Sequence, residues 1–315
     1  MGHTMKQHTV RREVRCEGMG LHSGSNIVLK VKPAPPNYGV KFRRVDLPGS
    51  PIITAHYNKV ADTSLATTIG SNGARISTIE HLMAALAGMG IDNVLIEVDG
   101  AEIPIFDGSA ADYIEVLQKA GLKKQDDYRH YYKVERPLTV REGEAYIKAT
   151  PSKEFQVRYI IDFPHPMIGR QEYAWKFDKT GFARDIAKAR TFGFLKDVEM
   201  LQRMGLARGG SLSNAVVFDD HRLLNMEGFR YPDECVRHKV LDFIGDLALA
   251  GKPVIGSFEV YKAGHTLHNH FLDALMAREE FCTLMTPPCR IDAFIPSSTI
   301  PAFMDGFSLS AKPAC

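Results

Sequence analysis

One type of segment occurs twice in the sequence, once in each half. Residues 78–87 have the pattern of a helix that ends at glycine, and residues 93–98 follow with the pattern of a strand. In the second half, residues 232–250 have the pattern of a longer helix, again ended by glycine, and residues 254–260 have that of a strand. Each predicted helix carries a histidine. The repetition indicates two similar halves that each combine helix and sheet.

The composition excludes several classes of protein. Lys and Arg number 39 against 37 Asp and Glu, a formal net charge of +2, so the overall positive field of a nucleic-acid-binding protein is absent. No uninterrupted apolar run reaches ~18 residues, and the first residues lack the apolar core of a secretory signal. The five cysteines are scattered and form no CxxC pair. We therefore expect a cytoplasmic protein that does not bind nucleic acid.

A charged stretch at residues 123–130 lies near the middle of the chain and has the composition of a linker. It predicts a first domain at residues 1–124 and a second at residues 125–285, followed by an extension at residues 286–315 that is rich in Pro and Ser. Strand patterns occur on both sides of the stretch, at residues 26–31, 39–42, 146–149 and 157–161.

The first group of polar residues opens the earlier predicted helix. Ser77 and Glu80 have the spacing of a capping box, which gives Glu80 a structural interpretation. The corresponding interpretation of His81 is a hydrogen-bonded core histidine. In the functional alternative, a histidine in the first turn ligates a metal ion and the adjacent carboxylate reaches a water on that ion. The Glu-His pair alone does not decide between the two.

The second group lies on the later predicted helix. His238, Asp242 and Asp246 are spaced four residues apart and therefore share one helix face. A solvated polar face is the structural interpretation, but apolar residues border the row. A histidine and an aspartate one turn apart can bind the same ion. Together with His81 they would supply two imidazoles and one carboxylate, a set that suits catalytic Zn²⁺ and also the facial triad of Fe(II) enzymes.

The third group follows the last of these predicted strands. Gly264 and His265 are expected in a loop after this strand, and His268 and His270 come next, where a further helix is expected to begin. The three histidines could form a metal site, and a surface cluster is the simpler interpretation of His268 and His270. For His265 we favour a catalytic role. If Asp246 lies against it, the carboxylate raises the imidazole pKa, and the protonated ring can donate to a leaving group.

Several motifs occur in one order along most of the chain, from about residue 7 to about residue 275. In this order and spacing the chain resembles the zinc-dependent UDP-3-O-acyl-N-acetylglucosamine deacetylases of Gram-negative lipid A biosynthesis. The motifs that carry the resemblance are Gly-Leu-His-Ser-Gly at 20–24, Ser-Thr-Ile-Glu-His-Leu at 77–82, Glu-Ile-Pro-Ile-Phe-Asp-Gly-Ser-Ala at 102–110, Ile-Asp-Phe-Pro-His-Pro at 161–166, Ala-Arg-Thr-Phe-Gly-Phe at 189–194, Val-Arg-His-Lys-Val-Leu-Asp-Phe-Ile-Gly-Asp at 236–246 and Gly-His at 264–265.

The resemblance implies an α+β fold of two similar domains, with helices packed between two sheets and the site at the domain junction. It also implies that His81, His238 and Asp242 bind Zn²⁺, with Fe²⁺ as an alternative ion in the same site. The reaction it implies is removal of acetate from UDP-3-O-(3-hydroxyacyl)-N-acetylglucosamine, the committed step of lipid A biosynthesis.

The same resemblance assigns five residues to the chemistry of amide hydrolysis. Glu80 is the general base for a metal-bound water, and His265 protonates the departing glucosamine nitrogen. Thr191 polarises the amide carbonyl together with the metal, Lys239 holds substrate or transition-state charge, and Asp246 orients His265. These roles agree with what the reaction needs, namely an activated water, a polarised carbonyl and a protonated leaving amine.

The resemblance further assigns residues to the substrate, a UDP-linked acylated amino sugar. The segment 192–217 corresponds to an insert that forms an apolar passage for the 3-O-acyl chain, Leu65 lies in a region near that passage, and Phe163 corresponds to a position near the uridine end. The insert residues assigned in this way are Phe192, Phe194, Val198, Ala207, Gly210, Ser211 and Val217. The expected state is a monomer that associates transiently with a membrane surface.

Two other functions remain open on the sequence. The same two histidines and aspartate could hold Fe(II) in an oxygenase, although that reading leaves Glu80 and His265 without a role. A sugar-nucleotide-binding protein with structural histidines is a non-catalytic alternative, and it predicts that replacing Glu80 changes no measurable function. A serine or cysteine hydrolase is disfavoured because the chain has no Gly-x-Ser-x-Gly motif.

Overall fold

The computed structural model describes residues 6–285 and is built on two five-stranded sheets with the same strand order. The first sheet runs β2 (Val14–Met19), β3 (Asn26–Pro33), β9 (Val94–Val98), β4 (Val40–Arg44), β5 (Ile52–Thr54). The second runs β12 (Leu138–Glu142), β13 (Ala145–Thr150), β19 (Ser257–Tyr261), β14 (Gln156–Phe163), β15 (Gly169–Lys176). The predicted α+β class and the predicted repeat are both confirmed.

One parallel strand pair in each sheet accounts for the place of the central helices. β9 pairs parallel with β4, and β19 pairs parallel with β14, while the other pairs are antiparallel. Parallel neighbours need a long crossover, which usually contains a helix. The first crossover contains α1 (Glu80–Met89), and the second contains α5 (Glu234–Leu247). Both boundaries lie within three residues of the predicted helices.

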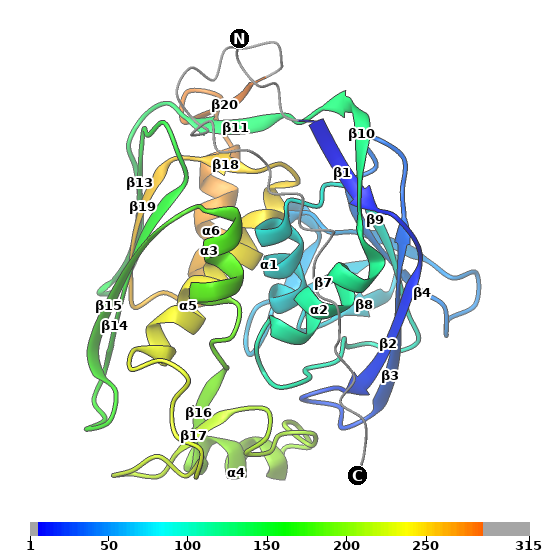
Figure 1. Cartoon of the computed structure of the whole chain (residues 1–315). Coiled ribbons are helices and arrows are strands. Elements are labelled where there is room, and N and C mark those ends of the chain that lie inside the picture. Colours follow the sequence, from blue (N-terminus) through cyan, green and yellow to red (C-terminus); the bar gives the residue numbers. More distant parts are fainter. Residues whose placement is uncertain (1–5, 286–315) are drawn as a thin grey trace, which may run out of the picture.

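The helices lie between the two sheets, as Figure 1 shows, with α1 packed against α5 at the centre. α2 (Ala111–Ala120) packs on α1, and α6 (His265–Met276) packs on α5. Buried side chains alternate along the strands, as in β3, where Leu29 and Val31 are fully buried. Each sheet therefore turns one apolar face toward the helices. This packing puts the polar residues of α1 and α5 in the interior of the molecule.

Smaller sheets and short helices complete the fold. They are β1 (Lys6–Val10) with β10 (Leu122–Tyr128), β11 (Tyr131–Val134) with β18 (Val254–Ile255) and β20 (Cys282–Met285), β6 (Val60–Asp62) with β7 (Thr68–Ser71) and β8 (Ala74–Ile76), and the helical turns η1 (Tyr57–Lys59), α3 (Lys179–Gly181), η2 (Phe182–Ile186) and η3 (Ala248–Ala250). None of the helices formed by residues 6–285 has the length and apolar character that crossing a membrane requires.

The prediction of a linker at residues 123–130 is wrong. Most of this stretch is the strand β10, which pairs antiparallel with β1. The side chain of Gln125 is buried and hydrogen-bonded to Asn93 and to the carbonyl of Ala34, while the neighbouring charged side chains point to solvent. The strand partner lies more than a hundred residues away in sequence, so local composition could not reveal it. The predicted extension at residues 286–315 lies outside the described residues.

The predicted insert forms a separate layer at one end of the molecule, at the bottom of Figure 1. It begins with β16 (Phe192–Phe194), continues through α4 (Leu195–Arg203) and returns along β17 (Val216–Phe218), which pairs parallel with β16. None of the residues of α4 is buried. Between these strands the insert also contacts the first half of the chain, where the backbone N–H groups of Arg208 and Gly209 donate to the carbonyls of residues 22 and 21.

Candidate metal centre and active site

A glycine in the last turn of α5 allows the two central helices to meet. A β-carbon added at Gly245 would lie 2.1 Å from the carbonyl oxygen of Glu80, at the start of α1. A glycine in a helix interior costs about 0.5–1 kcal/mol relative to alanine, and here it permits a backbone contact that no other residue allows. The crossing brings Glu80 and His81 beside Asp242 and Asp246. Helix packing therefore assembles the site from residues about 160 positions apart.

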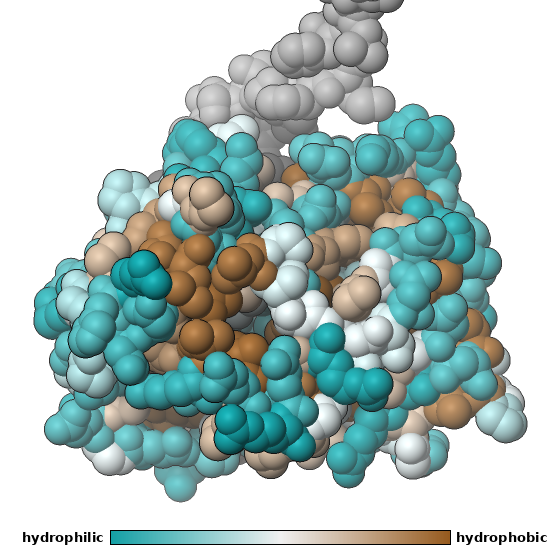
Figure 2. Space-filling view, turned by 90° about the horizontal axis from the view of Figure 1, so that it is seen from below, coloured by the Kyte–Doolittle hydropathy of each residue, from teal (hydrophilic) through white to brown (hydrophobic). Residues whose placement is uncertain are grey.

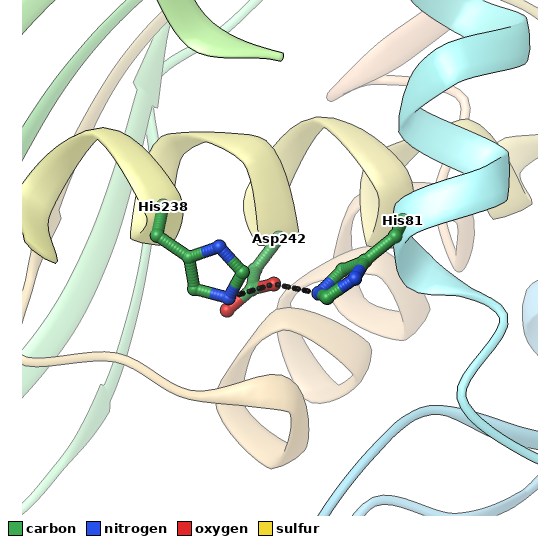
Figure 3. Close-up of side chains that lie close together, drawn as sticks. All are labelled: His81, His238 and Asp242. Atoms are coloured by element: carbon green, nitrogen blue, oxygen red, sulfur yellow. Dashed lines mark ion pairs between the residues drawn. The ribbon is translucent and has the colours of Figure 1, made fainter. Parts of the chain in front are cut away.

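The structure brings together the three residues predicted to bind metal. His81 Nε2 lies 3.6 Å from Asp242 Oδ1, and His238 Nε2 lies 3.4 Å from the same oxygen. Their possible ligand atoms all lie within 4.8 Å of one another, and all three side chains are buried. In Figure 3 the two rings, one from each central helix, point toward the carboxylate.

The protonation states of His238 and Asp242 suit a cation. His238 Nδ1 donates to the carbonyl of Ala189 at 3.0 Å, which leaves the Nε2 lone pair directed at the cluster. Burial lowers the pKa of His238 to about 3, so the ring is neutral. Burial opposes ionisation of Asp242, but the cationic Lys239, whose Nζ lies 2.7 Å from Oδ2, holds its pKa well below the usual range.

One buried oxygen in this cluster lacks a hydrogen-bond partner. Asp242 Oδ1 finds none among residues 6–285, although a buried carboxylate oxygen is normally paired. It faces the Nε2 atoms of His81 and His238 at distances too long for hydrogen bonds. Two imidazoles and one carboxylate around such a gap fit Zn²⁺ or Fe²⁺. The residues present therefore fit the metal that the resemblance implies.

A second cluster of two histidines and one aspartate lies one turn further along α5. Asp246 Oδ2 lies 2.7 Å from Nδ1 of both His265 and His268. Burial would lower the pKa of His265, but the charge and hydrogen bond of Asp246 raise it to about 9. Burial lowers the pKa of His268. Asp246 therefore has one cationic and one neutral imidazole on the same oxygen.

Two expectations for this second cluster are wrong. His265 does not lie in a loop but is the first residue of α6. His268 was expected at the surface, yet it is buried, and its Nε2 lies 3.2 Å from the hydroxyl of Tyr159. The spacing of four residues predicts that Asp246 lies on the same face of α5 as His238 and Asp242. That His268 also contacts Asp246 depends on the packing of α6 against α5, which the sequence does not show. His270 does lie at the surface, paired with Glu142.

Glu80 lies between the two clusters. Burial raises the pKa of its carboxyl, which favours the proton-accepting role of a base. Its Oε2 accepts a hydrogen bond from the backbone N–H of Thr67 at 3.0 Å, and its Oε1 lies 4.0 Å from His265 Nε2. The site therefore holds a carboxylate and a cationic imidazole that face each other beside the metal cluster.

The predicted capping box between Ser77 and Glu80 is not formed. α1 begins at Glu80 with Ile79 as its N-cap residue, and no side chain caps it. Thr78 has φ of 62°, a left-handed conformation that is rare for a β-branched residue, and it separates Ser77 from the helix. The hydroxyl of Ser77 instead accepts a hydrogen bond from Thr68. Strain next to Glu80 accompanies its placement in the site.

A loop of the first half holds the backbone of Thr191. Its N–H donates to the carbonyl of Gly108 at 2.7 Å. Gly108 has φ of 83°, and a β-carbon there would lie 2.0 Å from the carbonyl oxygen of Asn214 in the insert. The carbonyl of Ala189, two residues before Thr191, accepts the hydrogen bond of His238. The predicted Lys239 therefore contacts a predicted metal-binding residue directly, whereas Thr191 lies two residues along the chain from such a contact.

Three of the predicted substrate-binding aromatics form one cluster. The ring of Phe163 lies 5.5 Å from that of Phe192 and 6.0 Å from that of Phe194, as measured between centroids. The ring of Phe192 lies 6.4 Å from that of His238. The aromatic cluster therefore connects the insert with the metal-binding residues.

The other predicted substrate-binding residues differ in exposure. Leu65 is 45% exposed, in the loop between β6 and β7. Within the insert, Val198 and Gly210 are half-buried, Ala207 and Val217 are buried, and Ser211 is exposed. Figure 2 looks onto this end of the molecule and shows hydrophobic residues gathered at the surface among hydrophilic ones. The large apolar side chains that the insert exposes are Leu195, Met200, Met204 and Leu212.

Sequence reasoning missed three residues that support the site. Thr67 contacts both Glu80 and Asp246, and it carries no motif that would have identified it. Arg190 is buried and paired with the fully buried Glu234 through its Nε at 2.9 Å, so it attaches the start of α5 to the segment before β16. His268 is the third. The buried pair of Arg190 and Glu234 would have indicated a structural role for Arg190, but the burial of these residues is known only from the structure.

Comparison with known proteins agrees with this geometry. A family model described as UDP-3-O-acyl N-acetylglycosamine deacetylase matches residues 7–277. The UDP-3-O-acyl-N-acetylglucosamine deacetylase of Myxococcus xanthus (strain DK1622) is 48% identical over 284 residues, 90% of this chain and 90% of that protein. The protein with the same name from Acidithiobacillus ferrooxidans (strain ATCC 53993 / BNL-5-31) is 46% identical over 278 residues, 88% of this chain and 91% of its own. The resemblance inferred from the motifs is confirmed, and the chain belongs to the UDP-3-O-acyl-N-acetylglycosamine deacetylase family.

Proposed function

We propose that this protein is a Zn²⁺-dependent amide hydrolase that removes acetate from UDP-3-O-(3-hydroxyacyl)-N-acetylglucosamine in lipid A biosynthesis. The observation that carries the proposal is the convergence of the cluster His81, His238 and Asp242 with a carboxylate and a cationic imidazole that face each other, 4.0 Å apart. The names of the two relatives supply the substrate and the bond that is broken. An Fe(II) oxygenase would leave both facing groups unused.

His81, His238 and Asp242 would hold the metal ion. When bound, Zn²⁺ supplies a positive charge that lowers the pKa of a water to about 7 and polarises the amide carbonyl. Lys239 holds Asp242 ionised through its 2.7 Å contact with Oδ2, which leaves Oδ1 for the metal. We treat Fe²⁺ as an alternative ion in the same site because the donor set also suits it.

Glu80 takes the proton of the attacking water. Its Oε2 is occupied by the N–H of Thr67, so Oε1 is the oxygen that accepts the proton. Burial raises the pKa of the carboxyl, which makes the ionised group a stronger base than an exposed glutamate. The rigid backbone contact at Gly245 keeps Glu80 at a constant distance from α5.

His265 donates a proton to the leaving amine. Its Nδ1 is held by Asp246, so Nε2 is the nitrogen that faces Glu80 and the reaction. With a pKa raised to about 9, the ring is protonated at neutral pH and can act as an acid. Base and acid then act on opposite sides of one amide carbon.

Thr191 and Lys239 complete the proposed chemistry. The hydroxyl of Thr191 donates to the oxygen of the amide carbonyl as negative charge develops on it, and the ammonium of Lys239 adds positive charge nearby. Both residues belong to segments that contact predicted metal-binding residues, through the carbonyl of Ala189 and through Asp242. Preorganised donors of this kind are worth about 3–4 kcal/mol in a transition state.

The substrate would extend from this centre into the second half of the molecule. We place the 3-O-acyl chain along the apolar insert and the loop of Leu65, and the uridine near Phe163. The aromatic cluster of Phe163, Phe192 and Phe194 supports this placement because it joins the insert to the proposed metal-binding residues.

We also propose residues 1–124 and 125–285 as the two domains of the protein, and the repeated strand order of the two sheets supports this division.

The experiment that tests the proposal couples metal analysis with acetate release. Protein treated with a chelator should lose acetate release from the acylated UDP-sugar, and added Zn²⁺ should restore it. The reaction should also run without oxygen, which separates a hydrolase from an oxygenase. Full activity in protein shown to be metal-free would overturn the metal-dependent mechanism, and no acetate release by the metal-loaded protein would overturn the substrate assignment.

A further inference from the structure

One buried threonine contacts both the proposed base and the carboxylate that holds the proposed acid. Thr67 is 2% exposed and lies just before β7. Its backbone N–H donates to Glu80 Oε2 at 3.0 Å, and its hydroxyl donates to Asp246 Oδ1 at 2.5 Å. The same hydroxyl oxygen lies 3.3 Å from His265 Nδ1. No motif and no role in the mechanism above accounts for this hydroxyl.

The hydroxyl completes the hydrogen bonding of Asp246. Oδ2 of this carboxylate is engaged by the Nδ1 atoms of His265 and His268, so Oδ1 is the oxygen that remains. Thr67 supplies its donor, and the carboxylate then has partners on both oxygens. A carboxylate bound on both oxygens cannot rotate about its terminal bond without losing a hydrogen bond. The orientation of His265 therefore depends on Thr67 as well as on Asp246.

The position of Thr67 in the fold gives this contact a further consequence. Thr67 and Glu80 belong to the first half of the chain, whereas Asp246 and His265 belong to the second. The carbonyl of Thr67 also accepts a hydrogen bond from the N–H of Ile79, directly before α1. Its backbone is thus tied to the element that carries the base, and its hydroxyl to the element that carries the acid. One residue therefore links the two elements through hydrogen bonds.

We propose that Thr67 is a positioning residue that keeps Glu80 and His265 in register across the junction between the two halves, through its hydroxyl group. The inference rests on the proposed function, because it concerns the base and the acid of that reaction. Misplacement of a catalytic group by about 1 Å can cost about 10²-fold in rate. Loss of the hydroxyl should therefore lower turnover while the metal and the substrate still bind.

The test replaces Thr67 by valine, which keeps the shape and the backbone N–H and removes the hydroxyl. We expect Thr67→Val to lower kcat about 10- to 100-fold, with KM within about twofold of wild type and unchanged Zn²⁺ content. Thr67→Ser keeps the hydroxyl and should retain most of the wild-type kcat. Wild-type kcat in Thr67→Val would overturn the inference, and so would an equal loss in both variants, because the effect would then come from packing.

A neighbouring residue provides the matched control. Thr68 is also buried, and its hydroxyl donates to Ser77 at 3.0 Å, away from both Glu80 and Asp246. Thr68→Val should lose a similar amount of thermal stability as Thr67→Val and keep wild-type kcat. An equal loss of kcat in the two valine variants would overturn the inference. Glu80→Gln tests the proposed function separately from the role of Thr67. If Glu80→Gln keeps wild-type activity, the proposed mechanism is wrong, whatever the result for Thr67→Val.

Discussion

Two clusters of the same composition stand one turn apart on α5, and they differ in how their groups meet. The first consists of His81, His238 and Asp242, and the second of His265, His268 and Asp246. In the first, the histidine nitrogens stay 3.4 and 3.6 Å from the carboxylate oxygen, which has no hydrogen-bond partner among the described residues. In the second, both histidines lie 2.7 Å from theirs. The ligand atoms of the first cluster are therefore spaced as a bound ion would require, whereas those of the second cluster are already hydrogen-bonded to one another.

The same difference appears in the charge of the histidines. Burial lowers the pKa of His238 to about 3, and its ring is neutral, as the proposed ligand role requires. Burial acts on His265 in the same direction, but direct contact with Asp246 overcomes it and raises the pKa to about 9. Distance to the carboxylate therefore decides whether each of these buried histidines is neutral or cationic, and we propose the roles of ligand and acid on that basis. Residue type and spacing alone do not contain this information.

The largest effect is expected from a change in the first cluster. His238→Ala removes one of three ligands, so the protein should lose its Zn²⁺ and about 10³-fold or more of its activity. Metal content and acetate release measure the two losses. His270→Ala is the control, because His270 lies on the surface and pairs with Glu142. Full metal content in His238→Ala would show that the two clusters had been assigned the wrong way round.

A smaller effect is expected from the corresponding change in the second cluster. His265→Ala removes the proposed acid but no proposed ligand, so kcat should fall about 10²-fold while Zn²⁺ content stays at the wild-type level. The comparison between the clusters breaks down if this variant loses its metal along with its activity. Measurement of both quantities on the same sample makes the result decisive.

The smallest effect concerns the pH profile. Activity that needs protonated His265 declines as pH rises through its pKa, which Asp246 raises to about 9 against the opposing effect of burial. Asp246→Asn removes that negative charge, so the pKa should fall and the alkaline limb of kcat should move to lower pH, with about a tenfold loss at neutral pH. Asp273→Asn on the exposed side of α6 should leave the limb in place. An unmoved limb in Asp246→Asn would contradict the assignment of His265 as the acid.

Local pattern was sufficient for the elements that carry the site. The repeated helix, glycine and strand predicted both crossover segments, because an apolar stripe at helical spacing and a glycine at the helix end are local features. The spacing of His238, Asp242 and Asp246 likewise predicted one shared face of α5. The family, too, could be inferred from motif order, and comparison with known proteins confirmed it.

The errors have one origin. Residues 123–130 have the composition of a linker but form β10, because a partner strand at the N-terminus satisfies their backbone. Ser77 and Glu80 have the spacing of a capping box, but their side chains bond to Thr68 and Thr67 instead. In each case the residues bond to a partner that only folding brings close, and not to the neighbour in sequence that the local pattern suggested. Thr67 and His268 were missed for the same reason.

The sequence by itself determined the two crossover helices and the strands that follow them, that the chain repeats one arrangement, and which residue types are available for chemistry. These depend on periodicity and chain stereochemistry, which act over a few residues. Only the tertiary structure decided that α1 and α5 cross at Gly245, that one aspartate meets its histidines at 2.7 Å while the other keeps a gap, and that Thr67 joins the halves. Charge state and ligand geometry depend on burial and on distances of a few tenths of an ångström, and these exist only after the chain has packed.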